Sequence, residues 1–272
     1  MSNALALSQE VICAFLECGR VQAELYLNGF PILYASYTRP ITAQSVHPFL
    51  IDGLNTFELV IEPGQTPSVA REPRDVSVDK EGYARAWLGG YAENAPVFPG
   101  QGRRVADIVF HRDAEPSDLK FPASFHASFD LGNWRGPLAW QDAPALRLDD
   151  EMRDAAFATL HRLVQIHRDG DVEALCDIFA PHIRDFVRIF GWTEADLRKR
   201  FQEMLVGYVD DPDAILPWNE SDTDFRLVAH GRLIECINKD WLPTLRMRTP
   251  TGQILKKAVY LGIDGGKLHV FR

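Results

Sequence analysis

Two side chains in the second half of the sequence are of types that transfer protons, and both fall among apolar neighbours. His167 lies on the apolar stripe of an expected helix, where it could act as acid or base because small environmental shifts move a histidine pKa across neutrality. Glu235 lies on the apolar face of an expected strand, where burial would raise the carboxyl pKa and favour a general base. Together with Trp218, they are the residues that we expect to line a pocket.

Each of these side chains also has a structural interpretation. His167 falls near the C-terminus of its helix, where the helix dipole and a backbone carbonyl would stabilise it. The end of a strand could return Glu235 to solvent. If residues 225–237 form one strand, His230 lies on the opposite face from Glu235, which disfavours a His–Glu pair acting in one cavity.

A second group of side chains could bind anions. Arg246 and Arg248 alternate with apolar residues, and Lys256 and Lys257 follow on the next apolar run. Such a basic stripe could bind a carboxylate or an acidic partner. The alternative is an ordinary solvated sheet face that its charge protects from edge pairing.

The sequence contains no Gly-x-Ser-x-Gly elbow, no phosphate loop and no His-Glu-x-x-His zinc pair. We therefore expect neither a cofactor nor a metal. The four cysteines show no Cys-x-x-Cys spacing, which favours reduced, buried thiols and a cytoplasmic location. They are Cys13, Cys18, Cys176 and Cys236.

Composition narrows the classes of partner. At 272 residues the chain is long enough for two domains, and its net charge of −9 is shared by both halves. An evenly acidic surface disfavours nucleic acid, because no basic patch would release counterions. The apolar run over 11–16 is too short to span a bilayer and has no basic residue before it, so we expect neither a signal peptide nor a membrane anchor.

The first half of the sequence alternates between short apolar runs and turn residues, which is typical of antiparallel strands. Asn28-Gly29 favours a type I′ hairpin because both residues tolerate positive φ, and Asp52-Gly53 favours a second turn. Further strands are expected over 84–91, 105–111 and 124–131. This pattern predicts a β-sandwich domain over residues 1–131, followed by a partly docked linker over 132–148.

The strand entry Gly53–Leu59 weakly resembles that of jelly-roll, carbohydrate-binding-like sandwiches. The resemblance implies a structural role for this strand entry and no sugar site. Sugar binding would instead require exposed aromatic side chains, such as Trp87 and Tyr91, that form a platform.

The hydrophobic period changes to that of helices at residue 149. An apolar stripe at helical spacing begins there, with Asp149 or Asp150 as cap and Gly170 as terminator. Asp171 and Thr193 are expected to begin two more helices. Residues 183–190 fit either a helix or a strand, and an antiparallel meander follows from residue 225.

Residues 150–272 resemble the NTF2-like, SnoaL-like family. The resemblance lies in the first long helix, in Gly170–Pro181, in Thr193–Leu197 and in Ile263–Leu268. It implies an α+β domain over 149–272, in which three helices pack on a curved antiparallel sheet and leave a conical pocket. The family includes isomerases, dehydratases, cyclases and non-enzymatic modules, so the fold alone implies no reaction.

These observations predict an α+β two-domain protein, with an N-terminal antiparallel β-sandwich before an NTF2-like (cystatin-like) domain. The preferred function is non-catalytic binding or protein interaction, as in an adaptor or immunity-type protein. The alternative is an NTF2-like enzyme (isomerase, dehydratase or hydrolase type) that acts on a small apolar molecule by acid/base chemistry. A protein or a small apolar molecule is the expected partner. A homodimer that forms through the C-terminal sheet is a further alternative.

Overall fold

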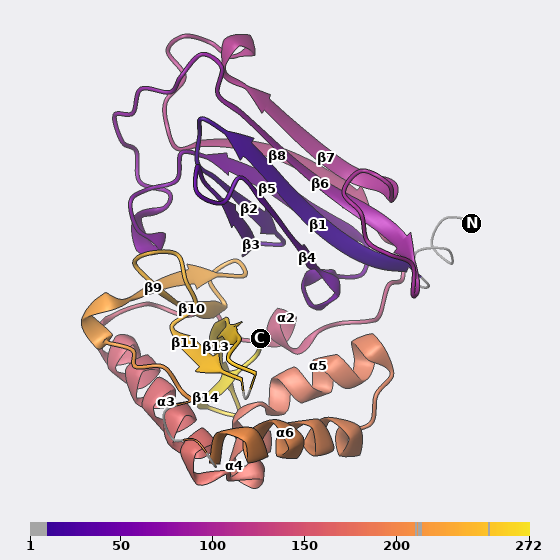
Figure 1. The fold of residues 1–272 in the computed structure, drawn as a ribbon, viewed down its shortest axis with the longest axis vertical. Coiled ribbons are helices and arrows are strands. Elements are labelled where there is room, and N and C mark those ends of the chain that lie inside the picture. The colour runs from indigo at the N-terminus through magenta and orange to yellow at the C-terminus, as the bar shows by residue number, and fades with distance from the viewer. Residues whose placement is uncertain (1–9, 210, 212–213, 250) are drawn as a thin grey trace. The chain divides into compact units, whose positions relative to one another are not determined.

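The computed structural model describes residues 10–209, 211, 214–249 and 251–272. Over these residues the chain is an α+β protein with antiparallel sheets and five α-helices (Figure 1). It divides into two compact units, Met1–Pro137 and Leu138–Arg272. Each unit is described by itself.

The first unit contains two four-stranded antiparallel sheets, in the orders β4-β1-β6-β7 and β3-β2-β5-β8. The sheets pack face to face: β1 and β4 contact β3, and Phe110 of β7 packs on Phe125 of β8 with ring centroids 5.4 Å apart. The strands are β1 Glu10–Gly19, β2 Ala23–Leu27, β3 Phe30–Ala35, β4 Ile41–Ser45, β5 Leu54–Ile61, β6 Tyr83–Ala92, β7 Arg103–His111 and β8 Ala123–Asp130. The unit therefore consists of two antiparallel sheets that pack on each other.

Local turn chemistry sets the first hairpin of this unit. Asn28 and Gly29, between β2 and β3, have φ of 51° and 77°, which is the conformation that the Asn-Gly pair favours. The side chain of Asn28 is buried and donates to the Asn55 Oδ1 at 2.8 Å. The strand entry at Asn55 is thus tied to the neighbouring hairpin.

His47 is a buried histidine of the first unit and has a structural role. It lies in a short 3₁₀ helix, His47–Phe49, and its Nε2 accepts the backbone N–H of Ile12 at 2.9 Å. Burial, together with the positive charge of Arg135, lowers the pKa of His47 to about 4. The ring is therefore neutral at neutral pH and serves as a hydrogen-bond acceptor for β1.

The segment expected as a linker is bonded into both units. Asp52 accepts the backbone N–H groups of residues 134–136 at 2.7, 2.7 and 3.0 Å within the first unit. In the second unit, the N–H of Leu146 donates to the Gly231 carbonyl at 2.8 Å. Trp134 and Trp140 are both buried.

The second unit begins with helices that have clear terminal signals. The N-cap side chain of Asp149 accepts the N–H of Met152 at 3.1 Å, and Gly170 ends α3 at φ 66°. The α-helices of this unit are α2 Ala139–Asp142, α3 Asp150–Asp169, α4 Val172–Ile178, α5 Ala180–Phe190 and α6 Glu194–Val209. Residues 183–190 are helical, so a helix that the family resemblance does not imply lies between α4 and α6.

The sheet of the second unit has the order β14-β13-β10-β9, and β11 and β12 form a separate two-stranded sheet. The strands are β9 Thr223–Val228, β10 Leu233–Asn238, β11 Leu245–Arg248, β12 Ile254–Lys257, β13 Val259–Asp264 and β14 Lys267–Val270. The expectation of one strand over 225–237 is wrong. Ala229, His230 and Gly231 have φ of 51°, 57° and 80° and turn the chain into a hairpin, so His230 lies in an exposed turn.

The helices and one face of this sheet share a continuous hydrophobic core. Phe225, Cys236 and Val259 form a row across β9, β10 and β13, and all three are buried against helix residues such as Leu160 and Leu163. Alternation along β10 then directs Glu235 to the opposite face of the sheet. Among the described residues, no helix is long and apolar enough to cross a membrane.

Candidate functional site

The three residues expected to line a pocket lie in different places. His167 is 1% exposed, and its Nδ1 lies 2.7 Å from the carbonyl oxygen of Leu163, one helical turn earlier. Trp218 instead stacks on Phe157 of α3 and packs at a tilt against His161 of the same helix, with ring centroids 6.4 and 4.8 Å away. Since Glu235 is on the other face of the sheet, these contacts do not gather the three around one cavity.

Glu235 belongs to a buried row of polar side chains. Its Oε2 lies 2.5 Å from the Nε of Arg226, and its Oε1 accepts the hydroxyl of Tyr260 at 3.2 Å. The three residues are in register across β9, β10 and β13 and are each less than a tenth exposed. Its carboxylate is therefore held as the partner of a guanidinium, which is a poor arrangement for a general base.

A second buried ion pair joins the C-terminal residue, Arg272, to Asp185 of α5. Arg272 Nη1 lies 2.7 Å from Asp185 Oδ2, and Asp185 Oδ1 accepts the N–H of Ala139 at 2.7 Å. Burial lowers the pKa of Arg272, and the negative charge of Asp185 acts in the opposite direction. Both carboxylate oxygens are in use, so this pair also has the geometry of a structural contact.

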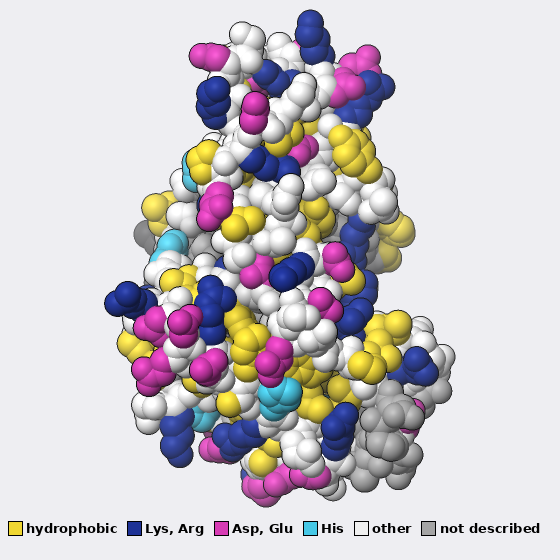
Figure 2. Space-filling view, turned by 90° about the vertical axis from the view of Figure 1, so that its left-hand side faces the viewer, with side chains coloured by type: hydrophobic (Ala, Val, Ile, Leu, Met, Phe, Trp, Pro, Cys, Tyr) yellow, Lys and Arg dark blue, Asp and Glu magenta, His cyan; other side chains and the backbone are white. Residues whose placement is uncertain are grey.

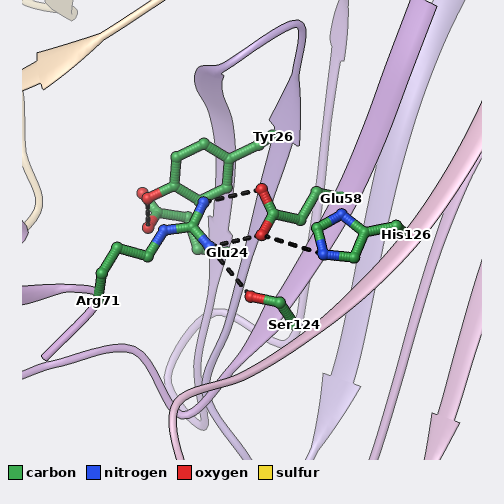
Figure 3. A network of polar contacts seen from close by, with 6 residues as sticks. All are labelled: Glu24, Tyr26, Glu58, Arg71, Ser124 and His126. Atoms are coloured by element: carbon green, nitrogen blue, oxygen red, sulfur yellow. Dashed lines mark hydrogen bonds and ion pairs between the residues drawn. The ribbon is translucent and has the colours of Figure 1, made fainter. Parts of the chain in front are cut away.

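A cluster of polar side chains lies on the outer face of the β3-β2-β5-β8 sheet of the first unit (Figure 3). We call it the outer-sheet network; it contains Glu24, Tyr26, Glu58, Arg71, Ser124 and His126. Arg71 makes two hydrogen bonds to Glu58, of 2.5 and 2.9 Å, and a third of 3.0 Å to Ser124. Its guanidinium lies 4.2 Å from the ring centroid of Tyr26.

The outer-sheet network fastens a loop to the sheet. Burial alone would raise the pKa of Glu58, but the hydrogen bonds and charge of Arg71 outweigh it and lower the pKa below its ordinary value. Glu58 is thus an ionised acceptor, and the bidentate pair holds the segment after Pro67–Val69 against β5. Arg74 and Glu62 add an ion pair of 2.8 Å at the same loop.

Replacing Arg71 with methionine should loosen this loop. We expect a loss of about 1 kcal/mol in the free energy of unfolding, because the Arg71 side chain is nearly half exposed and solvent weakens the pair. Urea denaturation measures this loss, and limited proteolysis over residues 62–82 measures the release of the loop. Arg39→Met, at an exposed turn, is the control. Equal stability and equal proteolysis of the two variants would contradict a role for Arg71 in holding the loop against the sheet.

The basic stripe lies on one face of the β11–β12 sheet. Arg246 pairs in register with Lys256, and Arg248 pairs with Ile254, so these four side chains share a face. We call it the basic face and include Thr244, which precedes Arg246 by two residues. Residues 245 and 247 point the other way and are buried in the core. The side chain of Lys257 and residue Pro250 lie outside the described residues.

Hydrogen-bonding capacity on the basic face is unused. Among the described residues, the buried Oγ1 of Thr244 and the buried Nε of Arg246 have no hydrogen-bond partner. No ion pair in the described part of the chain involves Arg246, Arg248 or Lys256. On the side of the molecule that Figure 2 shows, acidic and basic side chains are interspersed.

Trp87 and Tyr91 do not form the exposed aromatic platform that sugar binding would require. Trp87 and Tyr91 are 6% and 5% exposed. Trp87 stacks on Phe15 with ring centroids 5.0 Å apart, and the guanidinium groups of Arg85 and Arg104 each lie 5.3 Å from its ring. Cross-strand packing on the β4-β1-β6-β7 sheet therefore occupies the rings.

A pocket of about 350 Å³ lies at the turn between β6 and β7. Its walls include Tyr91, Phe98 and Arg103. The hydroxyl of Tyr91 donates to the Phe98 carbonyl at 2.7 Å, and Arg103 pairs with Glu10 at 2.6 Å. The polar groups of Tyr91 and Arg103 are thus occupied by contacts within the protein.

Metal-binding and thiol chemistry have no support in the described residues. They contain no cluster of three or more histidine, cysteine, aspartate or glutamate side chains that could hold a metal ion. All four cysteines are free thiols. Burial raises the pKa of Cys18 to about 11 and raises that of Cys236, which disfavours the reactive thiolate.

Comparisons of the chain with models of protein families, with curated proteins and with solved structures find no match. The functional assignment therefore rests on the residues described above.

Proposed function

We propose that the protein is a non-catalytic binding protein, of the adaptor or immunity type, that binds an acidic segment of a partner protein through the basic face. The observation that supports this is the set of cations on that face. Arg246, Arg248 and Lys256 lie together, and within the described residues none of them has a carboxylate partner. Charge-assisted contacts with a partner's carboxylates would use them.

The local charge contrasts with that of the whole chain. Residues 241–263 contain two arginines, two lysines and neither aspartate nor glutamate, whereas the chain has a net charge of −9. A basic patch attracts the acidic surface of a partner, whereas the acidic remainder of the protein repels it. Such complementarity favours selective association, and salt should weaken it.

The unused donors give a second reason to expect a carboxylate ligand. A buried polar group without a hydrogen bond costs about 1–3 kcal/mol. The Thr244 hydroxyl and the Arg246 Nε–H are two such groups on the basic face. Because both atoms are buried, a carboxylate could accept from them only after the side chains that cover them move aside on binding.

The acid/base groups of the second unit favour binding over catalysis. Glu235 forms an ion pair with Arg226 and accepts a hydrogen bond from Tyr260. The Nδ1 of His167 contacts the Leu163 carbonyl of its own helix. The resemblance of residues 150–272 to the NTF2-like family is compatible with this function, because that family includes non-enzymatic modules. The NTF2-like enzyme is the weaker candidate.

Charge reversal at the basic face tests the proposal. A fluorescein-labelled heptapeptide of alternating glutamate and valine should bind the full chain, and its lysine–valine counterpart should not. We expect Arg246→Glu/Arg248→Glu to weaken binding at least about tenfold, which corresponds to about 1.4 kcal/mol. Fluorescence anisotropy at low and high salt measures the affinity.

The control carries the same change in net charge on other surfaces. Arg39→Glu/Lys199→Glu reverses two exposed cations outside the basic face and should bind the glutamate peptide like the unmodified protein. Equal loss in both double variants would show attraction to net charge alone. That result, or no binding by the unmodified protein, would exclude the proposed site.

A further inference from the structure

The β11–β12 sheet has one paired edge and one open edge. On the β11 side, Leu216 donates its N–H to the Arg246 carbonyl at 2.9 Å, and Arg248 donates its N–H to the Ala214 carbonyl at 2.6 Å. Over the described residues, β12 pairs with β11 and with no other strand. Backbone groups of β12 that point away from β11 are therefore available to another strand.

The open edge carries apolar side chains that water covers in the isolated chain. Ile254 is 51% exposed and Leu255 is 47% exposed. Because neighbouring residues of a strand point to opposite faces, Ile254 lies on the basic face and Leu255 lies on the other. A strand added beside β12 would cover part of both side chains and would satisfy the open backbone groups.

The charges of this sheet discriminate between occupants. Pairing of β12 with β12 of a second copy would bring Lys256 close to the same lysine of that copy, and like charges on neighbouring strands are destabilising. A strand with carboxylates at alternate positions would instead place opposite charges beside Lys256, with Arg246 on the same face one strand further away. The edge therefore disfavours the homodimer through this sheet and favours an acidic strand.

We infer that β12 accepts an extended acidic segment of a partner protein as an additional β-strand, an inference that rests on the proposed function of the basic face. The segment carries glutamate or aspartate at every second residue, on the face of the sheet that carries Lys256 and, one strand further away, Arg246 and Arg248. Apolar residues alternate with them and face the side of Leu255. Backbone hydrogen bonds to β12 supply the affinity, and the side chains of the basic face supply the selectivity.

Two N-methylated versions of the glutamate–valine heptapeptide separate strand addition from simple charge attraction. One is methylated on its glutamate amides and the other on its valine amides, so only one of them blocks the edge that meets β12. Both keep every carboxylate. We expect one peptide to lose at least about tenfold in affinity. The parent peptide should also slow amide hydrogen exchange over residues 254–257 by about tenfold or more.

The outcomes distinguish this inference from the proposed function. If both methylated peptides bind like the parent and exchange over 254–257 is unchanged, strand addition is excluded. The proposed function then survives, provided that charge reversal at Arg246 and Arg248 still weakens binding. If the parent peptide does not bind, both strand addition and the proposed function are excluded. A peptide-free dimer in sedimentation that dissociates in a Leu255→Lys variant would overturn the inference in favour of a second copy.

Discussion

Glu235→Ala is expected to lower the free energy of unfolding by about 3–5 kcal/mol, which is the usual cost of removing one partner from a buried ion pair. Glu235 is 4% exposed and Arg226 is 7% exposed. Without the carboxylate, the Arg226 guanidinium loses its 2.5 Å partner and the Tyr260 hydroxyl loses its acceptor, while both stay buried. Urea denaturation followed by circular dichroism measures the difference.

Removing both charges should recover most of that loss. Replacement of a buried ion pair by apolar side chains of similar volume is often neutral or stabilising, since no charge is then buried alone. We therefore expect Arg226→Met/Glu235→Leu to be more stable than Glu235→Ala by about 2 kcal/mol or more.

Glu203→Ala, at an exposed position of α6, is the matched control and should change stability by less than about 0.5 kcal/mol. A small loss in Glu235→Ala, similar to that of the control, would contradict the buried pair. A carboxylate free for acid/base chemistry would then become the better interpretation of Glu235.

The position of Glu235 illustrates what the sequence could and could not supply. Its place on a strand with a buried face follows from alternation, and the sequence predicts it. Its partner depends on a turn at Ala229-His230-Gly231, where two non-glycine residues adopt positive φ. Non-glycine residues rarely adopt positive φ. Gly231 was therefore the only residue of this turn that indicated the hairpin, which places Arg226 beside Glu235.

Elements with strong local signals were predictable. The Asn28-Gly29 hairpin and the two ends of α3 follow from turn and cap chemistry, which acts over a few residues. Helix α5 was ambiguous because its β-branched residues suit either helix or strand. Packing of Ile183 and its helical neighbours against the core decides it.

Contacts between distant residues were out of reach. Arg71 meets Ser124, 53 residues later, from a loop whose sequence carries no periodic pattern. Whether the donors of Thr244 and Arg246 find hydrogen-bond partners depends on the tertiary packing around β11, which the sequence does not specify. Alternation did predict that Arg246 and Arg248 share a face, and the register of β11 with β12 adds Lys256 to it.

Asn55→Ala is expected to cost about 3–4 kcal/mol in the free energy of unfolding, since each buried group left without a hydrogen bond costs about 1–3 kcal/mol. The Asn55 side chain is fully buried. Its Oδ1 accepts from the Ile51 N–H at 2.9 Å and from Asn28 at 2.8 Å. Its Nδ2 donates to the carbonyls of Ile51 and Gly53, each at 2.9 Å.

Two further variants separate the hydrogen bonds of Asn55 from its packing. Asn55→Asp keeps the shape but cannot donate to the two carbonyls, so it should be about as unstable as Asn55→Ala. Asn219→Ala removes an exposed cap that bonds one N–H, and about 1 kcal/mol is expected. If Asn55→Ala is no worse than Asn219→Ala, the turn at Gly53 alone holds the entry of β5. If Asn55→Asp is as stable as the unmodified protein, the two donated bonds contribute little and the acceptor Oδ1 carries the effect.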